Sequence, residues 1–215
     1  MKSYLFFIST YWMIAFSFVS YAQEIQDDTK IGFSIGYGSE FKNRNYTYSN
    51  QYLKLQFLTT FKKTKKFSYD LVLQPEYNRG THQLLNLYFV KPEEENYIEK
   101  REKYTKLKTC NEYVLNVGLL LRFSFSKRSN LYMLGSVGPM YIDTATERLS
   151  KGFAFADVLA LGFNYKVGQF ILDVRPNLRH TSNAGLQSNN SGFNTRNLEF
   201  GILFMPKKSV KSLLN

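Results

Sequence analysis

Cysteine and histidine are scarce in this sequence, which limits the sites it can build. Among 215 residues there are one cysteine, Cys110, and two histidines, His82 and His180. A single cysteine excludes an intramolecular disulfide, and this inventory supplies neither a cysteine-based nor a three-histidine zinc site. A glycine-rich phosphate loop is also missing, because Gly36-Tyr37-Gly38 lacks the third glycine of that motif. We therefore expect neither a metal nor a cofactor.

Long apolar runs are missing too, except at the start of the chain. Every later stretch is interrupted by Asp, Lys, Glu, Arg or Asn before it reaches the length of a membrane-spanning helix. Residues 1–22 carry a single early lysine, continue without charge and end in Ser20-Tyr21-Ala22, a small-x-small cleavage site. This pattern predicts a signal peptide over residues 1–22, with an uncleaved anchor as the alternative. The mature domain is then expected over residues 23–206, followed by a short basic tail over residues 207–215.

Acidic residues are outnumbered by basic ones, 17 to 28, which gives a net charge of +11. A strongly basic protein favours nucleic acid or an anionic surface as its partner. Because an exported protein does not meet cytosolic nucleic acid, we expect no nucleic-acid partner and an anionic membrane surface instead. Runs of Lys and Arg are expected to decorate turns and loops, and contact with anionic lipid headgroups is a second role for them.

Aromatic residues, in contrast, are plentiful, with 19 Phe and 16 Tyr, and they recur at alternate positions. A period of two indicates a strand with one apolar face and one polar or small face, and pleated sheets favour aromatic side chains. The pattern predicts eight strands, each long enough to cross a bilayer at a tilt. Their ranges are Ile31–Tyr37, Leu53–Phe61, Phe67–Tyr77, Tyr113–Phe123, Leu131–Tyr141, Phe153–Tyr165, Phe170–Ser182 and Asn197–Met205.

The connections between these strands alternate in length. Short basic turns are expected at Lys62–Lys66, Lys127–Asn130 and Val167–Gly168, and longer polar segments at Lys42–Ser49, Thr81–Asn111, Thr144–Gly152 and Gly185–Arg196. This alternation is typical of bacterial outer-membrane barrels, with the long segments as solvated external loops. We therefore expect an all-β fold, an eight-stranded antiparallel transmembrane β-barrel. The alternative is a water-soluble lipocalin-like barrel, whose interior would have to hold the larger side chains.

The seventh predicted strand is the most informative. Four of its polar positions are expected to line the lumen: Asp173, Arg175, Asn177 and Arg179. Because lumen and lipid faces alternate along a barrel strand, His180 and Ser182 should project toward lipid.

His180 and Ser182 lie two residues apart on one strand face, so their side chains are expected to be neighbours. A serine hydroxyl becomes a useful nucleophile when an adjacent base takes its proton, and imidazole suits that task. If the strand runs outward, the pair lies at the interface of the outer leaflet. The alternative interpretation is that two polar residues simply close an exposed strand end.

The register of the preceding hairpin offers His180 a partner. If Val167-Gly168 is a two-residue turn, Phe163 opposes Leu172, which pairs apolar with apolar. Asp157 then becomes the diagonal neighbour of His180, about 7–8 Å away between backbones. A carboxylate that faces lipid is costly unless it is paired or has a role, although an Asp near the interface can also simply reach water.

Two short segments match a known family pattern. Residues 179–186 read RHTSNAGL, and residues 190–194 read NSGFN. His-x-Ser-Asn-Ala followed by Asn-x-Gly, in the seventh of eight strands, resembles the lipid A 3-O-deacylase (PagL) family of outer-membrane esterases. The resemblance implies hydrolysis of an ester-linked acyl chain of lipid A, with lipopolysaccharide in the bacterial outer membrane as the partner.

The resemblance also implies roles for the motif residues. Ser182 would be the nucleophile and His180 the general base. The side chain of Asn183 and the backbone N–H groups near Ala184 and Gly185 would stabilise the oxyanion of the tetrahedral intermediate.

The sequence departs from the family pattern at the residue that orients the histidine. The family usually has Glu two residues after the glycine of Asn-x-Gly, where this chain has Asn194. An Asn can hold an imidazole tautomer but gives the imidazolium no charge stabilisation, and Glu199 is expected on the lumen side. An imidazolium that forms at a low-dielectric interface is stabilised more by a carboxylate than by an amide, which favours Asp157 as the partner of His180. Asn194 remains the alternative, because a residue on a loop can approach His180 without the diagonal backbone separation that limits the reach of Asp157.

A second function class fits the same fold. Small eight-stranded barrels of the OmpA and OmpX types have structural or adhesive roles that reside in their loops. The His-Ser pair discriminates between the two classes, because a structural barrel does not need those residues on its lipid face.

Overall fold

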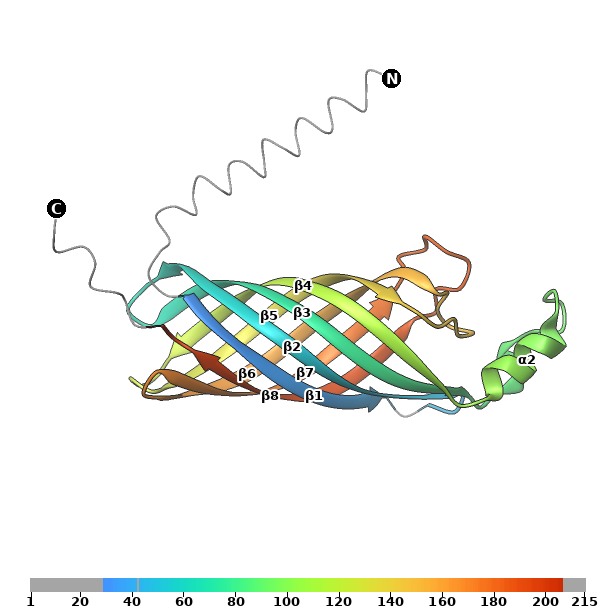
Figure 1. Ribbon diagram of the computed structural model, residues 1–215, viewed down its shortest axis with the longest axis horizontal. Helices are drawn as coiled ribbons and strands as arrows, with labels where there is room; N and C mark the ends of the chain where they lie inside the picture. The colour runs from blue at the N-terminus through green and yellow to red at the C-terminus, as the bar shows by residue number, and fades with distance from the viewer. Residues whose placement is uncertain (1–28, 42, 207–215) are drawn as a thin grey trace, which may run out of the picture.

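Eight antiparallel strands form one closed barrel, in which each strand pairs with its neighbours in sequence and β1 pairs with β8 (Figure 1). The structure, a computed structural model, describes residues 29–41 and 43–206, so the predicted signal peptide and C-terminal tail lie outside the described residues. The strands are β1 (Thr29–Glu40), β2 (Tyr46–Lys63), β3 (Phe67–Leu84), β4 (Lys108–Ser124), β5 (Ser129–Ile142), β6 (Gly152–Val167), β7 (Phe170–Ser182) and β8 (Phe193–Phe204). The predicted fold class is confirmed.

The two ends of the barrel differ in the length of their connections. At one end, called the turn end here, the turns comprise residues 64–66, 125–128 and 168–169. At the other, the loop end, the loops comprise residues 41–45, 85–107, 143–151 and 183–192. The longest loop contains the 3-10 helix η2 (Leu87–Phe89) and helix α2 (Tyr97–Thr105), which projects beyond the barrel (Figure 1). Neither helix is long and apolar enough to span a membrane, and the same is true of every helix in the described residues.

Several strands extend further toward the loop end than expected. Four segments predicted to lie in loops are strand instead: Tyr46–Ser49, Thr81–Leu84, Lys108–Asn111 and Phe193–Arg196. Their outward residues are largely polar, which is typical of a loop. Their inward residues, however, pack in a buried cluster inside the barrel that includes Tyr46, Tyr48, Cys110 and Phe193. Packing on one face is enough to keep the strands paired beyond the apolar belt.

The outward face of the barrel is apolar. Large side chains such as Phe33, Leu55, Leu119 and Leu161 are about half exposed, with exposed fractions of 51%, 51%, 60% and 63%. A surface of this kind is unfavourable in water and suits the hydrocarbon of a bilayer. The lipocalin-like alternative is therefore wrong, because the larger apolar side chains point outward and not into the barrel.

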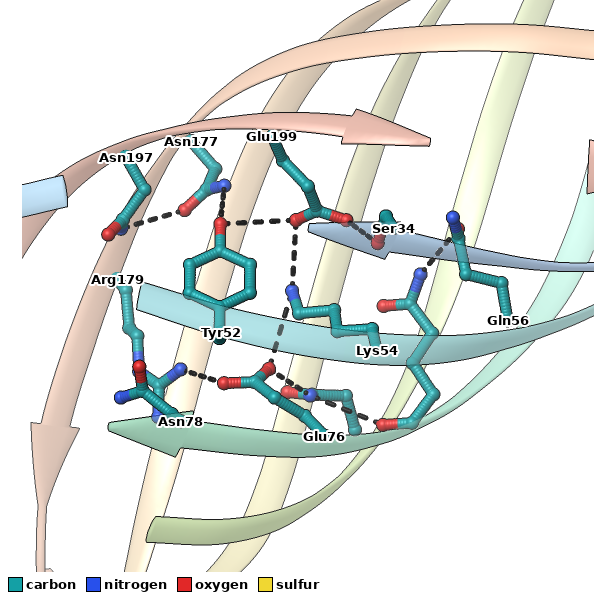
Figure 2. Close-up of polar contacts among 12 residues, drawn as sticks. Ser34, Tyr52, Lys54, Gln56, Glu76, Asn78, Asn177, Arg179, Asn197 and Glu199 are labelled. Carbon is teal, nitrogen blue, oxygen red and sulfur yellow. Dashed lines mark hydrogen bonds and ion pairs between the residues drawn. The ribbon is translucent and has the colours of Figure 1, made fainter. Parts of the chain in front are cut away.

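Besides buried apolar clusters, the barrel interior contains a network of paired charges (Figure 2). Lys54 lies between two carboxylates, at 3.4 Å from Glu76 and 3.1 Å from Glu199. Arg179 contacts Glu76 and lies 2.6 Å from Glu112. Buried ions are tolerable when they are paired and hydrogen-bonded, and these pairs connect strands on different sides of the lumen.

The predicted lumen residues of β7 and β8 are confirmed. Each is at least 95% buried: Asp173, Arg175, Asn177, Arg179 and Glu199. Because side chains alternate along β7, this burial fixes the outward direction of the residues between them.

Candidate functional site

His180 and Ser182 lie on the outward face at the loop end of β7. His180 is exposed and Ser182 half-buried, whereas Arg179 and Thr181 are buried in the lumen. The predicted outward direction of both side chains is confirmed. No hydrogen bond joins His180 to Ser182 in the described part of the chain, and contacts of this kind often tighten only when substrate binds.

Asn194 is the residue that contacts His180. The two residues are paired in the register of β7 with β8, and Asn194 Oδ1 lies 2.8 Å from His180 Nδ1. Because Oδ1 can only accept, Nδ1 carries the proton and Nε2 keeps its lone pair. The imidazole is therefore held in the tautomer that a general base needs, with Nε2 available on the side away from Asn194.

Asp157 lies closer to His180 in register than the sequence predicted. The turn between β6 and β7 is Gly168-Gln169, with Gly168 at φ 61°, so the predicted register is wrong by two residues. Asp157 is directly opposite His180 and is not its diagonal neighbour. A shift of two residues leaves every side chain on the same face of the sheet. Phe163 therefore pairs with another apolar residue, Val174, and the matching of apolar residues could not discriminate between the two registers. In the described residues, no hydrogen bond or ion pair joins Asp157 to His180.

Asn183 builds the loop that follows β7. It is fully buried, its Nδ2 donates to the carbonyl of Asn189 at 2.8 Å, and its Oδ1 accepts from the N–H of Gly185 at 3.1 Å. Two of the groups that the family resemblance assigns to the oxyanion thus have partners within the loop. Ala184, in the left-handed region at φ 53°, donates no backbone hydrogen bond to any other described residue.

Arg148, on the loop between β5 and β6, fastens the loop between β7 and β8. Its Nε donates to the carbonyl of Gly192 at 2.6 Å and its Nη2 to the carbonyl of Ser191 at 3.0 Å. The carbonyl of Arg148 accepts from the N–H of Gly192 at 3.1 Å, and its guanidinium lies 4.4 Å from the ring centroid of Tyr46. Sequence reasoning missed Arg148, since contacts between two loops leave no periodicity or motif in the sequence.

Gly192 and Phe193 connect the backbone held by Arg148 to Asn194. Gly192 has φ 61°, and a Cβ there would lie 2.3 Å from the carbonyl oxygen of Thr181, so only glycine fits. Phe193 is buried inside the barrel and stacks on Tyr48 at 4.6 Å between ring centroids. With the two residues before it fixed in this way, Asn194 is held opposite His180 in the pairing of β7 with β8.

A groove on the outward face begins at the candidate site. Its volume is about 630 Å³, and its polar part is formed by Asp157, His180 and Asn194. The apolar part includes Val137, Leu159 and Leu178, on three adjacent strands. Gly135 leaves the wall open, because a Cβ there would meet nothing within 4 Å. A polar corner that continues into an apolar groove can hold an ester with its hydrocarbon chain.

Comparisons with known proteins agree with this architecture. The chain is similar to the outer-membrane enzyme PagL, with a TM-score of 0.50 and 13% identity, over 80% of this chain and 97% of that one. It is also similar to Neisserial surface protein A, with a TM-score of 0.49 and 9% identity over 82% and 96% of the two chains. For the attachment invasion locus protein Ail of Yersinia pestis, the TM-score is 0.46 with 13% identity over 84% and 100%. At these identities the likeness to PagL concerns the fold alone.

The family assignment comes from the sequence profile. No curated protein sequence matches the chain. The profile of the family described as "Lipid A 3-O-deacylase (PagL)", however, matches residues 29–202, from the first described strand almost to the end of the last. The chain therefore belongs to the lipid A 3-O-deacylase (PagL) family and is a β-barrel of the bacterial outer membrane.

Proposed function

We propose that this protein is a serine esterase that hydrolyses an ester-linked acyl chain of lipid A in the outer leaflet. The observation that carries the proposal is the contact between His180 Nδ1 and Asn194 Oδ1, on the outward face beside Ser182. The pair lies where the apolar belt ends, so an imidazole with a free Nε2 adjoins a surface that can hold a hydrocarbon chain. Family membership and the groove at His180 support the same conclusion.

The chemistry follows from the free nitrogen of the imidazole. His180 Nε2 accepts the proton of Ser182 as the serine oxygen attacks the ester carbonyl, and the carbonyl π electrons move to the oxygen. When the tetrahedral intermediate collapses, the bond to the lipid A oxygen breaks, and that oxygen takes the proton from Nε2. Water then attacks the acyl-serine by the same route, with His180 again as the base, and a free fatty acid leaves.

Two partners are available to the imidazolium that forms in each step. Asn194 keeps Nδ1 protonated and fixes the plane of the ring. Asp157, directly across the strand pair, supplies a negative charge near an interface of low dielectric constant. We propose that Asn194 orients His180 and that Asp157 contributes through its charge.

The oxyanion needs a donor that the loop itself does not use. We propose the Ala184 N–H for this role, since the Asn183 amide and the Gly185 N–H bond within the loop. In this arrangement Asn183 and Gly185 shape the turn that presents Ala184, two residues after the nucleophile.

A reaction with purified protein tests the proposal. The refolded protein, incubated in detergent with purified lipid A, is expected to release one fatty acid, detected by mass spectrometry. Ser182→Ala should release none, and Ser188→Ala, an exposed serine of the same loop, should match the unmodified protein. If the unmodified barrel releases no fatty acid, or if Ser182→Ala releases as much, the proposal is wrong.

A further inference from the structure

The turn end of the barrel carries a belt of exposed cations. Seven side chains on three hairpins are exposed: Lys62, Lys63, Lys65, Lys66, Lys127, Arg128 and Lys166. We call them the basic collar. In the described residues of these turns and the adjoining outward strand positions there is no carboxylate, because Asp70 and Asp173 point into the lumen and are buried.

The collar is continuous from hairpin to hairpin. The carbonyl of Lys66 accepts from the N–H of Ser124 at 2.8 Å, which fixes the first turn against the end of β4. The carbonyl of Arg128 accepts from the N–H of Lys166, also at 2.8 Å, which fixes the second turn against the end of β6. The three groups of cations therefore lie side by side along one rim and act on the same region of space.

Aromatic side chains lie directly beside the collar on the outward face. Those with exposed fractions between 39% and 53% are Phe61, Phe67, Phe125, Tyr165, Phe170 and Phe204. They pack across strands, for example Phe67 on Phe123 at 5.3 Å and Phe170 on Phe204 at 5.7 Å between ring centroids. Aromatic belts of outer-membrane barrels lie at the boundary between hydrocarbon and headgroups, so the neighbouring cations lie at headgroup depth.

Carboxylates lie among the cations of the long loop at the opposite end. Lys100 lies 3.1 Å from Glu94, and Lys106 lies 2.9 Å from Glu102. The Lys106–Glu102 pair is exposed and the Lys100–Glu94 pair is half-buried, and acidic residues alternate with basic ones along α2. The loop arm therefore presents a mixed surface, whereas the collar presents one sign of charge.

We propose that the basic collar binds the phosphate headgroups of anionic glycerophospholipids, of the phosphatidylglycerol type, in the leaflet at the turn end. Each cation at a membrane surface attracts anionic lipid, and the attraction is screened by salt. The aromatic belt favours a lipid over a soluble ligand, since it fixes the depth of the collar in the headgroup layer. Bound there, the lipids hold the barrel at a defined height in the membrane.

Spin-labelled lipids test this inference. The refolded protein is reconstituted in phosphatidylcholine vesicles with a trace of spin-labelled phosphatidylglycerol or phosphatidylcholine, and electron paramagnetic resonance gives the relative association constant of the two. The collar variant carries Lys65→Gln, Lys66→Gln, Lys127→Gln and Arg128→Gln. The matched control removes the same number of charges from the loop arm, through Lys91→Gln, Lys100→Gln, Lys103→Gln and Lys106→Gln.

The unmodified protein is expected to prefer phosphatidylglycerol by about threefold or more at low salt, from the size of such surface attractions. The preference should fall to about one in the collar variant and in molar salt, and should stay unchanged in the loop-arm variant. The inference is overturned if the unmodified protein shows no preference, if the collar variant keeps it, or if both variants lose it equally. Heat-modifiable gel mobility checks that each variant is folded.

Discussion

At the scale of single residues, the account depends on which nitrogen of His180 is free. Asn194 Oδ1 accepts a hydrogen bond from Nδ1 at 2.8 Å, so Nε2 is the nitrogen that would act as the base in the proposed reaction. Ser182, two positions along the same strand face, is half-buried next to the loop that presents Ala184. The proposed nucleophile, base and oxyanion donor thus come from a short segment of chain, while Asn194, the proposed orienting residue, comes from β8.

Removal of the nucleophile or the base should abolish deacylation and spare the barrel. Ser182→Ala and His180→Ala are each expected to lower the deacylation rate by about 10³-fold or more, as for other Ser-His pairs. Both side chains lie on the outward face and make little packing, so the heat-modifiable gel shift should persist. Initial rates on lipid A micelles measure the effect. A variant that keeps activity within about tenfold would place the chemistry on other residues.

The residue that orients the imidazole can be identified by a pair of substitutions. Asn194→Ala removes the side chain that is hydrogen-bonded to His180 Nδ1, and we expect a loss of more than about a hundredfold in kcat. Asp157→Asn keeps the shape and removes the charge, and we expect a smaller loss of about three- to tenfold, because the carboxylate acts on the imidazolium through its charge and forms no hydrogen bond with the ring in the described residues. The opposite ranking of the two rates would make the carboxylate the orienting group.

At the scale of elements, the loop between β5 and β6 holds the loop that carries the motif. Arg148 binds the backbone of Ser191 and Gly192 through its side chain, and Leu149 forms an isolated bridge with Asn190. Thr146 and Leu149, on the bracing loop, are fully buried. The candidate site is thus positioned from inside the barrel mouth as well as along β7 and β8.

Loss of the Arg148 contacts should loosen the site without removing any reacting group. Arg148→Ala is expected to lower kcat by about tenfold through misplacement of Asn194, with less effect on KM. Hydrogen exchange of the amides in residues 183–192 should become faster in this variant. Lys151→Ala, an exposed cation of the same loop, is the control and should change neither quantity. If Arg148→Ala leaves both the exchange rates and kcat unchanged, the bracing role is wrong.

The elements show where sequence reasoning is strong and where it ends. Alternation of side chains predicted all eight strands, because the two faces of a barrel strand meet different solvents. It also predicted the outward direction of His180. The register of β6 with β7 was not predictable, since a shift of two exchanges one apolar pair such as Phe163–Leu172 for another, Phe163–Val174. The bracing contacts of Arg148 depend on two loops that meet only in the folded barrel.

At the scale of the whole molecule, the barrel has an apolar outer surface and a charged interior, which is the reverse of a water-soluble protein. Glu199 illustrates the interior, with Lys54 at 3.1 Å and Arg175 at 2.6 Å. Charges here cannot reach bulk water easily, so each depends on its partner across the lumen. The backbone ladders set the spacing of adjacent strands, and the network adds contacts across the lumen beneath the site.

Loss of one partner in the lumen should therefore destabilise the barrel strongly. Arg175→Met removes the guanidinium beside Glu199 and Asp173 and leaves carboxylates with fewer partners. The free energy of unfolding is expected to fall by about 3–5 kcal/mol, measured by urea unfolding in lipid vesicles. Arg128→Met, an exposed arginine at the turn end, should change it by less than about 0.5 kcal/mol. Equal effects of the two substitutions would mean that the lumen network contributes little.

The central claim is that this outer-membrane barrel deacylates lipid A through Ser182 and His180. The most direct measurement is mass spectrometry of lipid A extracted from bacterial cells that express the protein, Ser182→Ala or no barrel. The account predicts that lipid A from cells with the unmodified protein loses the mass of one ester-linked acyl chain, while the other two samples stay intact and identical. Lipid A of unchanged mass with the folded, unmodified protein in the outer membrane, or the same loss with Ser182→Ala, would contradict it.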